Sequence, residues 1–151
     1  LYKPAYNPNS DIGQNADTFK YGKYITHSIY GATSQTTTNY GIMFIARHPI
    51  EIIRITETHA VAGSDAGAVT LDVLKAGSGV AIASGTTLLS STFNLKSTAN
   101  TPVIKEGMDL SIDRVLIEGD RIGLVVSGTL TDLLDVNVTI YYKETNQGYI
   151  R

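Results

Sequence analysis

The feature that most constrains the fold of this sequence is a two-residue alternation of apolar and polar side chains in several short segments. It is longest in DVNVTIYYK (residues 135–143), where Val136, Val138 and Ile140 alternate with polar or aromatic neighbours. A period of two places every second side chain on one face of a β-strand, whereas a helix needs a period of 3.6. The segment therefore predicts an antiparallel strand whose buried face carries these three residues and Tyr142.

Other segments in the centre of the chain show the same strand pattern. In AVTLDVLKA (residues 68–76), every second residue from Val69 to Val73 is expected to point inward, and the residues between them, with Leu74, outward. YGIMFIA and IEIIRITETHA are rich in β-branched residues, and Pro49 separates them because proline cannot donate to a ladder. The glycine-rich VAGSDAGA (residues 61–68) predicts a turn between two strands.

The spacing of these segments predicts the fold class. About eight short strands with turn signals every eight to twelve residues are typical of a sandwich or jelly roll. We therefore expect an all-β protein, an antiparallel β-sandwich of the jelly-roll type. The polar GATSQTTTN (residues 31–39) is expected to be a loop, and LLSSTFNLKSTANT (residues 88–101) fits either a helical turn or a short strand.

The beginning of the chain differs in composition from the rest. Six of the nine tyrosines fall within the first 40 residues, and residues 1–23 add two prolines and no period. Disordered tails are poor in aromatic residues, so this stretch is expected to order against a neighbouring subunit rather than its own core. We expect an extended arm over residues 1–23 and a sandwich domain over residues 24–151. The expected partner interface comprises Tyr2, Tyr6, Phe19, Tyr21, Tyr24, Tyr30 and Tyr40.

Charge and composition argue against several classes of partner. Lys and Arg number 12 against 14 Asp and Glu, a net charge of -2, whereas a sequence-independent nucleic-acid binder needs a basic surplus. The longest apolar runs, around Ile42–Ala46 and Leu124–Val126, are far shorter than the roughly 20 residues of a membrane span. We expect neither nucleic acid nor membrane as a partner. Without cysteine, the chain forms no disulfide, thiolate nucleophile or cysteine-based zinc site.

Residue types that carry catalysis or bind metals occur without the spacing that such sites need. His27, His48 and His59 are scattered and match no metal-binding pattern. The string GSDAG lacks the form of a nucleophile elbow, because its serine directly follows the glycine. We expect no catalytic residues, no cofactor and no metal, and therefore a protein that is not an enzyme.

One acidic stretch leaves alternatives open, and it contains Asp109, Asp113, Glu118 and Asp120. Paired carboxylates can act in glycoside hydrolysis, and hard oxygen ligands can bind calcium. The spacing matches no calcium loop, and the chain has no tryptophan to stack a sugar. The expectation is a solvated loop closed by an aspartate turn.

Three segments resemble a known group of proteins: THAVAGSDAGAVTLDVLKAGSG, TLLSSTFNLKSTANT and LIEGDRIGLVVSGTLTDLLDVNVTIYYK. Together they look like small virion proteins of tailed bacteriophages, in which a jelly roll or related sandwich serves as a capsid cement (decoration) protein. Such sandwiches also occur in tail and fibre modules. The resemblance runs from about Ile50 to Lys143.

The resemblance implies a non-enzymatic protein on the outer surface of an icosahedral head. It implies a homotrimer that binds and stabilises the shell of major capsid protein. It also implies that the particle is assembled in the host cytoplasm. An aromatic arm that crosses a subunit boundary fits this role, because many contacts on a lattice raise avidity.

Two alternatives belong to other classes. A tail or fibre module would bind a host-surface glycan through the loops at residues 63–67 and 76–87. A glycan-active enzyme would place Asp109, Asp113 or Glu118 in a cleft.

Overall fold

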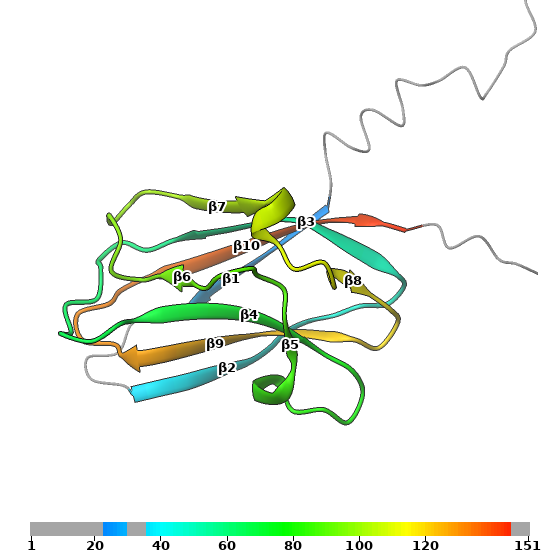
Figure 1. Cartoon of the computed structure of the whole chain (residues 1–151), viewed down its shortest axis with the longest axis horizontal. Helices are drawn as coiled ribbons and strands as arrows, with labels where there is room; N and C mark the ends of the chain where they lie inside the picture. The colour runs from blue at the N-terminus through cyan, green and yellow to red at the C-terminus, as the bar shows by residue number, and fades with distance from the viewer. Residues whose placement is uncertain (1–22, 30–35, 146–151) are drawn as a thin grey trace, which may run out of the picture.

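The computed structural model describes residues 23–29 and 36–145 and confirms an all-β protein built as a sandwich (Figure 1). Two antiparallel sheets face one another, and two short 3-10 turns interrupt the connections. The strands are β1 (Lys23–Ile29), β2 (Thr36–Ile45), β3 (Ile50–Thr58), β4 (Thr70–Ala76), β5 (Thr86–Thr87), β6 (Phe93–Asn94), β7 (Val103–Glu106), β8 (Val115–Leu116), β9 (Arg121–Thr129) and β10 (Val136–Glu144). The turns are η1 (Ile82–Ser84) and η2 (Gly107–Asp109).

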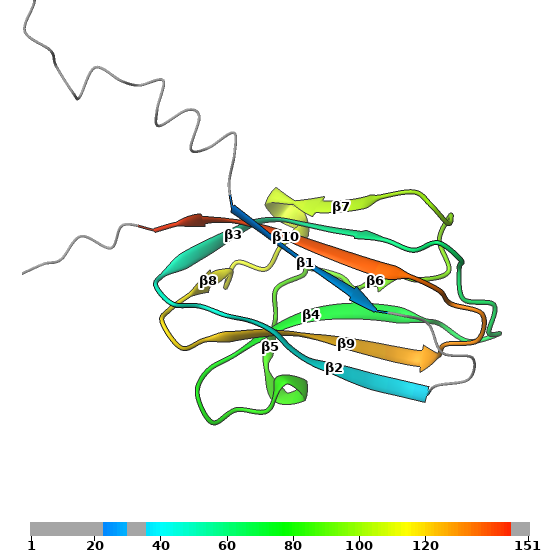
Figure 2. The same cartoon turned by 180° about the vertical axis from the view of Figure 1, so that it is seen from behind.

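The order of the strands is that of a jelly roll. Sheet A has the order β1-β10-β3-β7, with β8 also paired to β3; sheet B has the order β2-β9-β4-β5, with β6 also paired to β4. The pairings are nested: β1 pairs with β10, β2 with β9, β3 with β7 and β8, and β4 with β5 and β6. An antiparallel ribbon folded in half and wrapped into two sheets produces this nesting. Figure 2 shows the same arrangement from behind, with β1 crossing in front.

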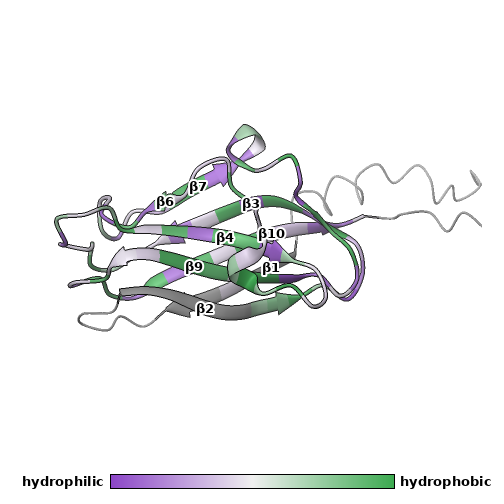
Figure 3. Ribbon diagram, turned by 60° about the horizontal axis from the view of Figure 1, so that its bottom comes forward, coloured by the Kyte–Doolittle hydropathy of each residue, from purple (hydrophilic) through white to green (hydrophobic). Residues whose placement is uncertain are grey.

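The two-residue alternation of the sequence becomes the core of the sandwich. Val69, Leu71 and Val73 are fully buried, as are the alternating positions of β10 from Val136 to Ile140. Tyr142 is partly buried and packs against the core, with its ring centroid 5.7 Å from that of Phe44. Along the strands of both sheets, hydrophobic and hydrophilic bands alternate (Figure 3). Burial of one face of each sheet therefore follows from the local pattern, as expected.

Leu74 lies on the outer face of sheet B, as expected, yet its side chain is only 7% exposed. Ala76 and Ile82 join it in a second, smaller buried cluster. The connection that contains η1 folds back over this face, and Gly85 permits its close approach. A Cβ atom at Gly85 would lie 2.3 Å from the backbone oxygen of Lys75. Leu74 thus points outward as predicted, but it is buried because a loop, not water, covers this part of the sheet.

Two other segments show tertiary pairing that the local pattern did not reveal. The polar segment 31–39 was expected to be a loop, but β2 already begins at Thr36, because Thr36 to Asn39 pair with β9. The stretch 88–101 contains the short strand β6, and its apolar residues are buried. The backbone N–H of Leu88 donates to Val73 and that of Leu95 to Val69, which fixes this stretch against β4.

Candidate interaction surface

Exposed apolar residues are concentrated in one stretch of the chain, at the edge of sheet A that β7 and β8 form. Nine large hydrophobic residues are exposed among the described residues, and five of them come from the segment between β7 and the turn after β8. We call these five the β7–β8 surface: Ile104, Met108, Ile112, Val115 and Ile117. Met108 is 95% and Ile112 100% exposed, values far from those of core residues. Apolar residues gathered in this way are typical of an interaction site.

The fold itself turns these side chains toward solvent. Leu110 is buried in the core and forms an isolated bridge with Leu89 of the opposite layer. The backbone N–H of Ser111 donates to Leu88, which anchors the middle of the connection. Met108 lies in the 3-10 turn η2 and Ile112 in a bend, so neither follows the orientation of Leu110 two residues away, and both side chains are exposed. In β8, Leu116 is buried, and its neighbours Val115 and Ile117 are exposed by strand alternation.

Ion pairs hold the backbone under this surface. Arg114 donates from Nε to Oε1 of Glu51 at 3.1 Å, and Lys143 Nζ lies 2.8 Å from Oε2 of the same carboxylate. The hydrogen bond from Lys143, together with Arg114, lowers the pKa of Glu51 despite its partial burial. The carboxylate is therefore held ionised between β3, β10 and the η2–β8 connection.

Lys75 ties the same connection to sheet B. Its Nζ donates to Oδ1 of Asp113 at 2.6 Å and to the backbone oxygen of Val115 at 2.9 Å. The Arg114 guanidinium also donates to the backbone oxygen of Gly107 at 3.2 Å. The backbone that carries the β7–β8 surface is therefore fixed by hydrogen bonds and ion pairs to residues of both sheets.

The aromatic residues predicted to form a partner interface are described only in part. Tyr2, Tyr6, Phe19, Tyr21 and Tyr30 lie outside the described residues. The backbone of Tyr24 lies in β1 opposite Tyr141, and that of Tyr40 lies in β2. The predicted arm, residues 1–23, also lies outside the described residues except for Lys23, with which β1 begins.

The acidic stretch is distributed over the surface. Asp120 accepts the backbone N–H of Ile117 through Oδ2 at 3.0 Å, which makes the expected aspartate turn. Asp113 is engaged by Lys75. Among residues 23–29 and 36–145, no group of three or more His, Cys, Asp or Glu side chains is arranged to hold a metal ion. Within the described chain, no helix is long and apolar enough to cross a membrane.

Sequence reasoning missed a buried pair of ionisable residues, Glu57 and His59. The Nδ1 atom of His59 lies 2.8 Å from Oε1 of Glu57, and both side chains are fully buried. His59 Nε2 lies 3.1 Å from the backbone oxygen of Ser97, which can only accept, so this nitrogen donates. Burial raises the pKa of Glu57, although the hydrogen bond with His59 opposes the shift. The E-x-H spacing was visible, but strand alternation alone does not distinguish a buried polar face from a solvated one.

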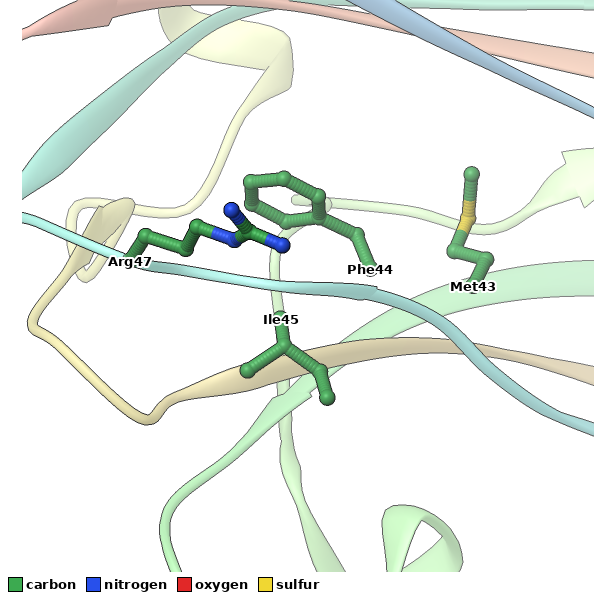
Figure 4. A pocket seen from close by; sticks show the side chains of 4 residues that line it. All are labelled: Met43, Phe44, Ile45 and Arg47. Carbon is green, nitrogen blue, oxygen red and sulfur yellow. The ribbon is translucent and has the colours of Figure 1, made fainter.

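An open pocket beside the end of β2 is lined by Met43, Phe44, Ile45 and Arg47 (Figure 4). Its volume is about 550 Å³. In the close-up, Phe44 and Met43 lie on one side of the strand and Ile45 on the other, with the Arg47 guanidinium beside the Phe44 ring. Its described lining offers one cation and no carboxylate. A glycosidase pair is therefore not assembled here.

No protein-family model matches this sequence, and no curated protein matches it. Among solved structures, the chain is similar to a chain of the cyanophage Pam1 capsid asymmetric unit, with a TM-score of 0.55 and 13% identity. That match covers 96% of this chain and 93% of the other. Matches to infectious bursal disease virus, strains Gx and Gt, have TM-scores of 0.36 and 0.35 at 13% and 14% identity. This chain spans 34% of the length of each of those two chains. At this identity, the cyanophage match shows a shared fold.

Proposed function

We propose that this chain is a non-enzymatic structural protein of a virion, specifically a decoration protein on the outer surface of a bacteriophage head. The observation that carries the proposal is the match to a chain of a cyanophage capsid, which covers 96% of this chain and 93% of the other. The match extends over almost the whole of both chains, so it relates the two folds rather than a common fragment. In this role the chain binds the shell of major capsid protein as a homotrimer.

The described surface is suited to a protein that assembles with other subunits. Met108 and Ile112 protrude from a backbone that is held by the buried Leu110 and by the ion pairs of Arg114 and Lys75. A rigid base reduces the entropy that binding has to overcome. Many copies with modest individual contacts on one shell reach high avidity. Exposed apolar side chains on a rigid base therefore support a structural protein that assembles with other subunits.

The runner-up is a tail or fibre module that binds a host-surface glycan through loops at one end of the sandwich. One of its two candidate loops, residues 76–87, contains the η1 connection that packs against sheet B through Ile82. The buried part of this loop packs against the sheet and so is not available to bind a glycan. The decoration and fibre functions place the chain on different parts of the particle, so its location separates them.

The experiment is immunogold electron microscopy of virions encoded by the same genome as this chain, with antibodies raised against the purified protein. Gold on the head surface is expected, and preincubation of the antibody with purified chain should abolish it. Gold on the tail or fibres would replace the decoration function with the fibre function. Virions that contain no copies of the chain by mass spectrometry would overturn both.

A second measurement separates a decoration protein from a component of the shell itself. Mild denaturant should release the chain while the shell stays closed, and purified chain should bind again to the stripped particles. The native mass of the free protein at micromolar concentration should be that of a trimer. A shell that falls apart whenever the chain is released would assign it to the shell, and a monomeric mass would exclude a preformed trimer.

A further inference from the structure

The β7–β8 surface lies directly across sheet A from the point at which residues 1–22 join β1. Lys23 pairs with Tyr142, and Tyr142 pairs with Ile52. The backbone N–H of Ile52 donates to Arg114 at 3.0 Å, and Arg114 lies between Ile112 and Val115 of the surface. Three strand spacings separate the two edges by about 14 Å. Residues 1–22 therefore join β1 at one edge of sheet A, and the β7–β8 surface lies at the opposite edge, level with Lys23 across the strands.

The aromatic, uncharged character of residues 1–22 as a whole suits the apolar β7–β8 surface. Residues 1–22 contain four aromatic side chains, and their two lysines are balanced by two aspartates. A neutral, aromatic-rich segment loses little hydration of charge when it packs on apolar side chains. Met108, at 95% exposure, offers a flexible thioether that packs well against aromatic rings.

The position of Tyr21 next to β1 favours a surface on another copy. Tyr21 is two residues from Lys23, so its Cα atom lies within about 7 Å of that of Lys23 in a fully extended chain. This reach of about 7 Å is half the distance across sheet A from Lys23 to Arg114. Tyr21, the aromatic residue nearest β1, therefore cannot reach the far edge of its own sheet, which leaves a neighbouring copy as the place where it can meet such a surface.

We propose that the β7–β8 surface receives residues 1–22 of a neighbouring copy of this chain. Donor and receiver occupy opposite edges of sheet A, so the contact joins two different surfaces, and repetition by rotation closes a ring of copies. This arrangement requires no shell and does not depend on the virion function proposed above.

Disulfide trapping tests the proposal, because the chain has no cysteine of its own. Two differently tagged full-length variants, Tyr6→Cys and Ile112→Cys, are mixed and mildly oxidised. The matched control replaces Ile112→Cys with Ser78→Cys, an exposed position on the η1 side of sheet B. We expect several-fold more mixed-tag disulfide dimer with Ile112→Cys than with Ser78→Cys. Adding Met108→Ser to the Ile112→Cys chain should lower the yield.

Three outcomes would overturn the proposal. Equal yields with Ile112→Cys and Ser78→Cys would show that the contact is not specific to this surface. No mixed dimer with either partner would show that the segment docks elsewhere. In a chain that carries both Tyr6→Cys and Ile112→Cys, a disulfide that forms only within one chain would place the segment on its own copy.

Discussion

The imidazole of His59 and the carboxylate of Glu57 form a pair, 2.8 Å apart, that is sealed from solvent at the end of β3. The pair also fixes the connection between β6 and β7. His59 Nε2 donates to the backbone oxygen of Ser97, and the backbone oxygen of His59 accepts the N–H of Asn100 at 2.7 Å. The second carboxylate oxygen, Oε2, has no partner among the described residues. The pair is therefore sensitive to the loss of either member.

His59→Ala should lower the free energy of unfolding by about 3 kcal/mol, because it leaves Glu57 buried without its partner. The matched control is His48→Ala. His48 pairs with Glu144 at 3.1 Å, but its side chain is 49% exposed, so its loss should cost about 1 kcal/mol or less. Urea unfolding of the three proteins measures both values. Similar small losses for the two variants would contradict a structural role for the buried pair.

The raised pKa of Glu57 predicts a direction of pH dependence. Because the pKa of the folded state lies above the ordinary value of 4.5, the folded protein binds this proton more tightly than the unfolded chain does. The stability from this group is thus complete below pH 4.5 and is lost as pH rises through the folded-state pKa. Compared with Glu57→Gln, the wild type should lose stability across that interval in urea titrations. A difference that grows with pH instead would refute the assigned shift.

Gly128→Ala should destabilise the protein more than Gly119→Ala, by about 2 kcal/mol. Both glycines have positive φ, 97° and 89°, so each substitution strains the backbone. Only at Gly128 would a Cβ atom also collide, 2.1 Å from the backbone oxygen of Ala68, whereas Gly119 has nothing within 4 Å. Because both variants carry the backbone strain, the difference between their melting temperatures in thermal unfolding measures the collision at Gly128. Equal melting temperatures would show that Ala68 can move aside.

Met108→Ser combined with Ile112→Ser should leave stability within about 0.5 kcal/mol of the wild type, because both side chains are exposed. If the β7–β8 surface joins copies, the native mass should fall to that of a monomer. Leu110→Ala, between them in the sequence, removes a buried side chain and should cost about 2–5 kcal/mol. Urea unfolding and mass photometry together separate association from folding. An unchanged oligomer in the double serine variant would exclude this surface as the contact.

Much of the fold could be predicted from local pattern. The alternation around Val138 and Leu71 identified two strands and the face of each that is buried. The errors occurred where a distant segment changed the surroundings of a residue. Leu74 is buried because the η1 connection covers it, and Thr36 is in a strand because β9 supplies its ladder partners. Neither neighbour is close in the sequence, so no local period could reveal them.

The candidate surface was harder to predict than the strands. Aromatic composition drew attention to the first 40 residues, whereas five of the nine exposed large hydrophobic residues of the described chain lie from β7 to the turn after β8. Met108 and Ile112 look like ordinary core residues in the sequence. Their exposure comes with the 3-10 turn η2 and the bend at Ile112, where strand alternation does not apply, while Leu110 between them is held inward by its bridge to Leu89.

The period of two was enough to predict an all-β chain, because it exposes alternate faces whatever lies nearby. It was also enough to predict the main buried residues, since apolar side chains on one face must leave water together. Which strands are neighbours became known only from the folded structure. The turn after β3 resembles a hairpin turn, yet β3 and β4 lie in different sheets. Pairing in a jelly roll joins the ends of the chain, β1 to β10, so the partners are chosen by the shared core and not by the connecting turns.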